Sequence, residues 1–238
     1  MRTLALDTTT RAGSVALLDA DRVVEERTGD ALRPHAERLP AEIIALLSAH
    51  GVTVADVDLF AVAAGPGSFT GLRIGIATIQ GLAFVRERPV VAVSALEALA
   101  QIGSRDLSRG DSVGAWIDAH RGDVFSALYR VAAGPMYQDD RLVEIEGPAV
   151  GDPAATIERW TELTNSSTFL LIGDRMPLDA PPPALPPPPL AGAIGRMAVC
   201  RARRGDTITA AGIQPLYVRR PDAEVARDRA KTLLRGGE

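Results

Sequence analysis

The sequence has few of the side chains on which many catalytic and metal sites depend. It contains one cysteine, Cys200, and three histidines, His35, His50 and His120. A single thiol excludes an internal disulfide framework and a metal site built from several cysteines. None of the histidines has a metal-binding partner at helical spacing, so we expect no metal in this chain. The Gly-x-Ser-x-Gly elbow of many hydrolases is also missing, so the sequence shows no hydrolytic nucleophile.

Aromatic residues and positive charge are scarce as well. Aromatic residues form 4% of the 238 residues, and the formal net charge is −4. Proteins that bind nucleic acid directly use cations for the phosphates and often aromatic rings for the bases, so the composition argues against such a protein. Asp7 interrupts the apolar start of the chain too early for a signal peptide, and no apolar run is long enough to span a membrane. We predict a cytoplasmic protein that makes no membrane contact.

What the sequence does contain is a glycine-rich stretch around which the chain is arranged. Residues 59–64 form a continuous apolar run, typical of a buried strand, and Gly65-Pro66-Gly67 ends it. Ser68 then has the position of a helix N-cap. No Gly-Lys-Ser/Thr sequence follows, so the stretch is not a P-loop. Two interpretations stay open: Gly65, Gly67 and Ser68 face a phosphate at the helix start, or they form a tight turn without a ligand, which the chemistry alone favours.

Hydrophobic periodicity predicts the order β-β-β-α-β-α-β-α over residues 3–102. In the first helix of this series, Pro40 suggests that the regular helix begins there, after an irregular turn at 34–36. The series ends in a polar stretch at 103–110, where we place a boundary between two lobes.

A second unit begins near residue 113 and repeats the start of the first. Each unit runs from a strand through an aspartate, Asp7 or Asp118, and a polar turn into another strand. The repeat predicts two lobes. The short apolar stretch 215–218 predicts a C-terminal segment that docks on the body through its first residues. We assign them to residues 1–105, 106–214 and 215–238. The nearly all-proline run 181–189 should be extended and unable to pair in a sheet.

The two polar turns are candidates for chemistry. In the first turn, the aspartate either holds a metal or a phosphate-bound water, or caps its own turn. The second turn is either an acid–base or phosphate-contacting site, or a solvated hairpin, which is the simpler interpretation. The candidates in the first turn are Asp7, Thr8 and Thr9. The candidates in the second turn are Asp118, His120, Arg121 and Asp123.

Several stretches together resemble the TsaB proteins, formerly called YeaZ. The stretches that carry this resemblance are 4–10 with 14–17, 35–40, 65–75, 94–100, 118–125 and 215–219. The resemblance is dense to about residue 105 and thinner to about residue 220. It implies an α/β protein with the actin-like ATPase (ASKHA) fold, in which two ribonuclease-H-like lobes each contain a mixed five-stranded sheet flanked by helices.

The resemblance also implies a role in making threonylcarbamoyladenosine, 3′ of the anticodon, in tRNAs that read ANN codons. In that family the protein is a partner of the metal-containing catalytic paralogue TsaD, which has a His-x-Glu-x-His metal run after the strand that corresponds to residues 89–93. Here the run reads Ala95-Leu96-Glu97-Ala98-Leu99, and its apolar side chains cannot bind a metal. We therefore expect no catalytic residue and no cofactor of its own, with ATP or ADP only at the interface of a complex. The alternative is a small-molecule kinase or ATPase of the same fold, whereas a peptidase has almost no residue support.

The family pairs through helices of the first lobe, which implies residues 35–50 and 70–85 in this chain. Gly71 and Gly75 would let a partner's helix approach closely. The expected partners are a TsaD-like paralogue, a TsaE-like ATPase, a second copy of the chain when it is alone, and tRNA through the complex. The interface residues expected on these helices are His35, Leu39, Ile43, Leu46, Leu47, Gly71, Leu72, Gly75, Ile76 and Ile79.

Overall fold

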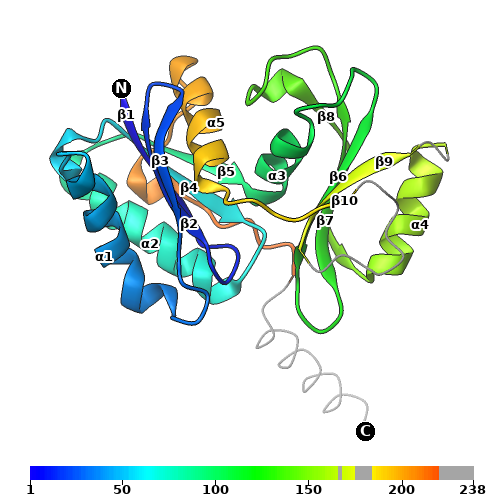
Figure 1. Cartoon of the computed structure of the whole chain (residues 1–238), viewed down its shortest axis with the longest axis horizontal. Coiled ribbons are helices and arrows are strands. Elements are labelled where there is room, and N and C mark those ends of the chain that lie inside the picture. The colour runs from blue at the N-terminus through cyan, green and yellow to red at the C-terminus, as the bar shows by residue number, and fades with distance from the viewer. Residues whose placement is uncertain (166–167, 175–183, 220–238) are drawn as a thin grey trace, which may run out of the picture.

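The computed structural model describes residues 1–165, 168–174 and 184–219. Two five-stranded sheets lie side by side, with helices between them and on their outer faces (Figure 1). Residues 181–183 of the proline-rich run and 220–238 of the C-terminal segment lie outside the described residues. None of the helices in the described ranges is both long and apolar enough to cross a membrane.

The first sheet has the strand order β3-β2-β1-β4-β5. Its strands are β1 (Arg2–Asp7), β2 (Ser14–Asp19), β3 (Arg22–Thr28), β4 (Leu59–Gly65) and β5 (Val90–Ser94). The first three strands pair antiparallel, whereas β4 pairs parallel with both β1 and β5. β4 is buried along its whole length, as its continuous apolar run predicted, because helices cover both faces of the sheet.

The outer face of this sheet is covered by α1 (His35–Ala49) and α2 (Phe69–Arg86) (Figure 1). The Ser68 hydroxyl caps α2 by accepting the Gly71 N–H at 3.2 Å, as predicted. The prediction that α1 begins at Pro40 was wrong, since the helix begins at His35. Pro40 lacks the N–H that would bond the Ala36 carbonyl, but both residues are exposed, so water is available to that carbonyl.

The second sheet has the order β10-β9-β6-β7-β8. Read from β8 to β10, this order repeats that of the first sheet read from β3 to β5. Its strands are β6 (Ser112–Asp118), β7 (Val124–Val131), β8 (Leu142–Gly151), β9 (Phe169–Gly173) and β10 (Ala184–Leu185). Its outer helix, α4 (Pro153–Leu163), is capped by Asp152 and buries Trp160 against Trp116. Two ribonuclease-H-like lobes in tandem form the actin-like ATPase fold, so the fold that the resemblance implied is present.

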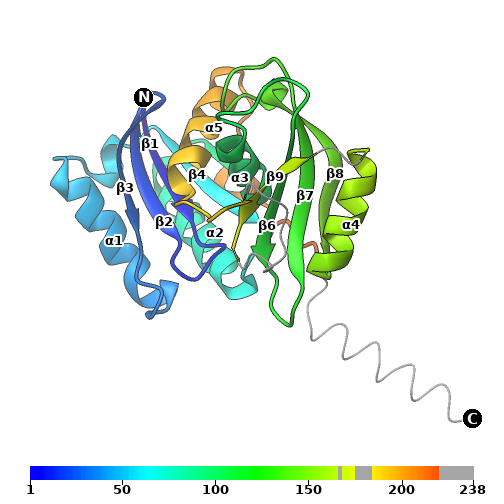
Figure 2. The same cartoon turned by 45° about the vertical axis from the view of Figure 1, so that its right-hand side comes forward.

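Two helices, α3 (Ala95–Gly103) and α5 (Ala191–Arg203), lie between the sheets (Figures 1 and 2). The largest hydrophobic cluster surrounds them and takes side chains from both sheets. α5 packs on β1, β2 and β4, so residues 191–203, which were expected in the second lobe, lie against the first sheet. Gly195 faces the Leu18 side chain, which lets α5 pack closely on the first sheet.

The described end of the proline-rich run contains the short strand β10. Its two residues, Ala184 and Leu185, pair parallel with Leu171 and Ile172 of β9. The prediction that this run pairs with no strand was therefore wrong for these two residues. They are the residues of the run that are not proline, so they keep the N–H groups that pairing requires.

Candidate functional site

The Asp7 carboxylate folds back onto its own turn. Its Oδ1 accepts hydrogen bonds from the Thr9 backbone N–H at 2.9 Å and the Thr9 hydroxyl at 2.6 Å. Burial raises the pKa of Asp7, and the two bonds from Thr9 oppose that rise. Asp7, Thr8 and Thr9, for which a phosphate-facing position was expected, are all buried in the first lobe. Asp7 caps its own turn instead.

Gly71 and Gly75 face this same turn. A methyl group added at Gly71 would overlap the Thr8 carbonyl oxygen, and one added at Gly75 would overlap the Thr8 hydroxyl. The expectation that these glycines make room for a partner's helix is therefore corrected. They let α2 approach the β1–β2 turn of its own chain.

His35, another expected interface residue, also makes contacts within the chain. Its Nε2 lies 2.9 Å from the Thr10 carbonyl oxygen, and its Nδ1 lies 2.8 Å from Nη2 of Arg38. Because a guanidinium only donates, Nδ1 accepts and the ring proton lies on Nε2. Arg38 is itself buried and has both carboxylate oxygens of Glu42 at 2.8 Å from Nη1. These bonds fix the β1–β2 turn to the start of α1.

The remaining expected interface residues are also turned inward. They form the hydrophobic core between the two outer helices and the first sheet, or pack at its edge, and each is at most 6% exposed. The apolar stripe was thus correctly located on each helix but assigned to the wrong neighbour. These residues are Leu39, Ile43, Leu46, Leu47, Leu72, Ile76 and Ile79.

The opposite face of the same helices carries exposed apolar side chains that were not predicted from the sequence. Ile44 of α1 is 60% exposed, and Phe84 and Val85 of α2 are 75% and 77% exposed. Gly81, also on α2, has no atom within 4 Å of the position that an added methyl group would take. The signal that could have found them is their position on the helix, since they are apolar residues outside the inward-facing stripe.

A cavity of about 720 Å³ lies between the two lobes. Gly67 and Ser68 line it at the start of α2, and Asp118, His120 and Arg121 line it from the β6–β7 turn. The structure therefore brings together two candidate sites that are far apart in the sequence. In the turn, the Asp118 carboxylate accepts the His120 N–H at 2.8 Å.

The C-terminal segment joins the lobes at this cavity, and its first residues dock as predicted. The Leu216 N–H donates to the Ala64 carbonyl at 2.7 Å, and a methyl group at Gly65 would lie 2.8 Å from the Leu216 carbonyl oxygen. Gly65 is thus covered by the chain's own backbone. On the other lobe, Arg219 donates to the Ala119 carbonyl at 2.8 Å and pairs with Asp123. Asp123 therefore binds this segment, and the segment closes one side of the cavity.

Tyr217 fills the space between these two anchors. Its ring lies 5.3 Å from that of Phe69, and its hydroxyl accepts a hydrogen bond from Nε of Arg73 at 3.2 Å. The Arg73 guanidinium in turn lies 3.8 Å from the centre of the Phe69 ring. No sequence pattern indicates this three-residue stack, because Tyr217 lies far from Phe69 and Arg73 in the chain.

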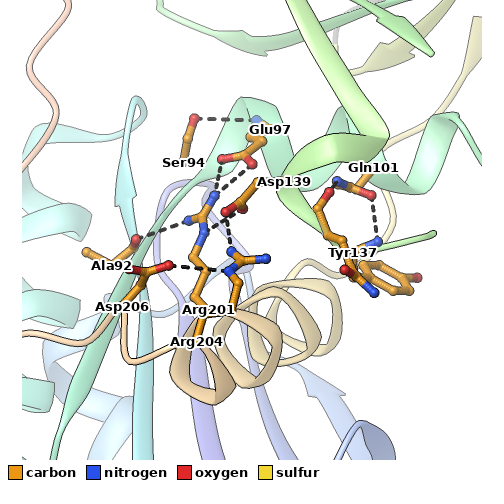
Figure 3. Close-up of polar contacts among 10 residues, drawn as sticks. Ala92, Ser94, Glu97, Gln101, Tyr137, Asp139, Arg201, Arg204 and Asp206 are labelled. Atoms are coloured by element: carbon orange, nitrogen blue, oxygen red, sulfur yellow. Dashed lines mark hydrogen bonds and ion pairs between the residues drawn. The ribbon is translucent and has the colours of Figure 1, made fainter. Parts of the chain in front are cut away.

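At the start of α3, buried apolar residues surround one acid. The Ala95, Leu96, Ala98 and Leu99 side chains have no exposed surface. Glu97 lies with both carboxylate oxygens 2.7 and 2.9 Å from Nη2 of Arg201, as Figure 3 shows. The carboxylate is therefore committed to a guanidinium on α5, and its neighbours in the run offer no metal ligand.

Comparison with known proteins identifies the family of the chain. The family described as "TsaD: tRNA N6-adenosine threonylcarbamoyltransferase" matches residues 28–165, more than half of the chain. The tRNA threonylcarbamoyladenosine biosynthesis protein TsaB of Escherichia coli is 37% identical over 164 residues, which cover 69% of this chain and 68% of that protein. The chain belongs to the TsaB family.

Other similarities to TsaB proteins span different shares of the chain. The TsaB protein of Haemophilus influenzae is 41% identical over 122 residues, which cover 51% of each chain. Among solved structures, a Pseudomonas aeruginosa protein described as similar to peptidase YeaZ superposes with a TM-score of 0.74 at 34% identity. That superposition covers 92% of this chain and 99% of the other. The TsaB fold therefore extends over nearly the whole chain.

Proposed function

We propose that this chain is a non-catalytic subunit in threonylcarbamoyladenosine synthesis on tRNA, and that it acts by pairing with a metal-containing TsaD-type paralogue. The observation that carries the proposal is at the start of α3. There the buried side chains of Ala95 and Leu99 stand where the TsaD metal run has its two histidines. The one acid there, Glu97, pairs with Arg201. Membership of the TsaB family, whose curated members are named for threonylcarbamoyladenosine biosynthesis, supports the pathway.

The exposed face of α1 and α2 supports the pairing. Ile44, Phe84 and Val85 expose large apolar surfaces, and such surfaces on a folded protein mark interaction sites when they form one patch. α1 and α2 contact each other, which places their outward residues on the same side of the first sheet (Figure 1). A second copy of the chain would use the same face, so a homodimer and the complex with the paralogue would compete.

The pairing is tested by isothermal titration of the purified TsaD-type paralogue into this chain and two variants. Phe84→Asp places a charge on the proposed face, and Val143→Asp is the matched control, since Val143 is 56% exposed on β8 of the other lobe. We expect Phe84→Asp to weaken binding at least about tenfold, about 1.4 kcal/mol, and Val143→Asp to leave it unchanged. Equal affinities for the two variants, or no binding by the unmodified chain, would overturn the proposed pairing. Because both side chains are exposed, thermal unfolding of each variant should match the unmodified chain.

The TsaE-like ATPase and tRNA enter this proposal as further members of the complex. A nucleotide, if one is bound, would lie where these subunits meet. The composition, with a net charge of −4, supports tRNA contact through the paralogue more than through this chain.

A kinase or ATPase of the same fold is the second candidate, and the inter-lobe cavity favours it. That cavity is bounded by the Ser68 helix start and the Asp118 turn, as a phosphate site between lobes requires. Against it, Asp7 is buried and caps its own turn. Titration of ATP with Mg²⁺ into the isolated chain separates the candidates: the subunit role predicts weak or no binding, and turnover of ATP by the chain alone would support the enzyme.

A further inference from the structure

A second cavity, of about 490 Å³, has a lining that the proposed function does not use. It lies where α5 meets the β2–β3 turn and the loop before β8, and its polar lining comes from Asp21, Arg22, Tyr137, Arg196 and Cys200. We propose that this cavity binds the phosphate group of a small molecule, held between the guanidinium groups of Arg196 and Arg22. The inference does not depend on the role in tRNA modification.

Arg196 is the central residue of the proposed site. Its Nε is buried and has no hydrogen-bond acceptor in the part of the chain that the structure describes. No carboxylate among residues 1–165, 168–174 and 184–219 pairs with its guanidinium, which instead lies 5.0 Å from the centre of the Tyr137 ring. The guanidinium lines the cavity and has no acid to neutralise its charge among the described residues, so an anion in the cavity would supply that missing partner.

Arg201 on the same helix, and Arg204 directly after its end, both have acidic partners. Arg201 contacts both Glu97 and Asp139, and Arg204 contacts Asp139 and Asp206 (Figure 3). Acidic side chains are therefore available along this helix, one and two turns beyond Arg196. The difference at Arg196 is local, because its surroundings provide an aromatic ring and a cavity in place of a carboxylate.

Tyr137 is itself held in place, so the ring that positions Arg196 is built into the fold. Its backbone has a φ of +68°, which a bulky residue seldom adopts. The Tyr137 N–H donates to Oε1 of Gln101 at 2.7 Å (Figure 3), and Nε2 of the fully buried Gln101 donates to the Gln138 carbonyl at 2.9 Å. Strained backbone that the surrounding structure enforces is typical of ligand sites.

Arg22 supplies the second cation. It is exposed, and none of the described residues forms a hydrogen bond or ion pair with its side chain. Asp21 lines the same cavity but lies 3.7 Å from Arg203, so part of its charge is already compensated. Two guanidinium forks suit a phosphate better than a carboxylate, since a phosphate offers three oxygens and a carboxylate only two.

The test measures thermal stabilisation of the full chain by inorganic phosphate, by adenosine monophosphate and by adenosine. Binding to the folded state raises the unfolding temperature with ligand concentration, and the titration yields Kd. We expect stabilisation by inorganic phosphate or by the monophosphate, but not by adenosine. Stabilisation by the monophosphate alone would identify a nucleotide as the ligand, and stabilisation by both would identify the phosphate group.

Three variants assign the effect to this cavity. Arg196→Gln and Arg22→Gln should each weaken phosphate binding at least about tenfold. The control is Arg130→Gln, which removes the same charge from an exposed position on β7. If Arg196→Gln impairs folding, Arg22→Gln decides, since that side chain is on the surface. No stabilisation by any phosphate compound, or an equal Kd in all three variants, would overturn the proposal.

Cys200 provides an independent readout because it is the chain's one thiol and lines this cavity. Bound phosphate should slow its alkylation by iodoacetamide in the unmodified chain and in Arg130→Gln, but not in Arg196→Gln. Alkylation rates that phosphate leaves unchanged in every variant would place the ligand elsewhere and contradict the assignment.

Discussion

Arg201 and Glu97 form an ion pair between the two helices that separate the sheets, although 104 positions divide them in sequence. Nη2 of Arg201 lies 2.7 and 2.9 Å from the two carboxylate oxygens, and its Nε lies 2.9 Å from Oδ1 of Asp139 (Figure 3). These acids, with burial acting against them, raise the pKa of the Arg201 guanidinium above its ordinary value. The pair joins α5, packed on the first sheet, to α3, packed on the second.

Removing the acid should therefore destabilise the whole molecule. We expect Glu97→Ala to lower the free energy of unfolding by about 2–3 kcal/mol, because it leaves a largely buried guanidinium with one acid fewer. Urea denaturation measures the change. The control is Glu158→Ala on the exposed side of α4, which should change stability by no more than about 0.5 kcal/mol. Equal effects of the two substitutions would show that the ion pair adds nothing to stability.

Two glycines of α2 should respond to alanine in opposite directions. Gly75→Ala should destabilise the chain by about 1–3 kcal/mol, because the new methyl group would overlap the Thr8 side chain. Gly81→Ala should stabilise it by about 0.5–1 kcal/mol, because the site is open and alanine is the better helix former. Thermal unfolding of both variants tests this assignment. If the Gly75→Ala variant folds with unchanged stability, Gly75 is not needed for the contact with Thr8, and the expected role at a partner interface would be favoured again.

The raised pKa of Asp7 predicts a pH dependence of stability. Since burial is its main cause, the folded state keeps this proton at pH values where the unfolded chain has lost it. The stabilisation is complete below the ordinary value of 3.8 and is lost as the pH rises through the raised pKa. The Asp7→Asn side chain has no titratable proton, and its carbonyl oxygen can still accept both hydrogen bonds from Thr9.

We therefore expect the free energy of unfolding of Asp7→Asn to fall less than that of the unmodified chain between about pH 4 and about pH 7. Glu26, whose pKa burial also raises, should keep part of the dependence in both proteins. Glu158→Gln serves as the control, and its pH profile should follow that of the unmodified chain. An Asp7→Asn profile parallel to the other two would contradict the raised pKa.

The C-terminal segment should restrain the β6–β7 turn. Arg219→Ala removes both the bond to the Ala119 carbonyl and the ion pair with Asp123. We expect faster hydrogen exchange of the turn amides at Ala119 and Asp123, while β1 stays protected. Arg130→Ala should leave exchange in this turn unchanged. If the Arg219 variant also behaves like the unmodified chain, the segment does not hold the lobes together.

Local sequence patterns predicted most of the fold. The apolar run of β4, the Ser68 cap, and the repeat beginning at Asp7 and Asp118 are short-range signals, and each matches an element of the structure. The prediction that the helix starts at Pro40 was wrong. A proline is tolerated in an exposed second turn, because water can reach the carbonyl that it leaves without a partner.

It was harder to predict which surface the apolar stripes and the glycines of these helices would contact. The apolar stripes of α1, with Leu39, and of α2, with Ile76, had the right periodicity. Periodicity does not show whether such a stripe faces a partner or the chain's own sheet. Gly75 likewise indicated a close approach without naming Thr8. The Arg201–Glu97 pair and the Tyr217 stack join distant segments, which no local pattern reveals.

The most direct test of the central claim is an omission assay for threonylcarbamoyl transfer to tRNA. The complete mixture contains this chain, the TsaD-type paralogue, the TsaE-like ATPase, threonylcarbamoyl-adenylate and tRNA, and one reaction contains this chain as its only protein. We predict product in the complete mixture, a loss of product when this chain is left out, and none from this chain alone. Transfer by this chain alone would contradict a non-catalytic role, and undiminished transfer in its absence would contradict a required one.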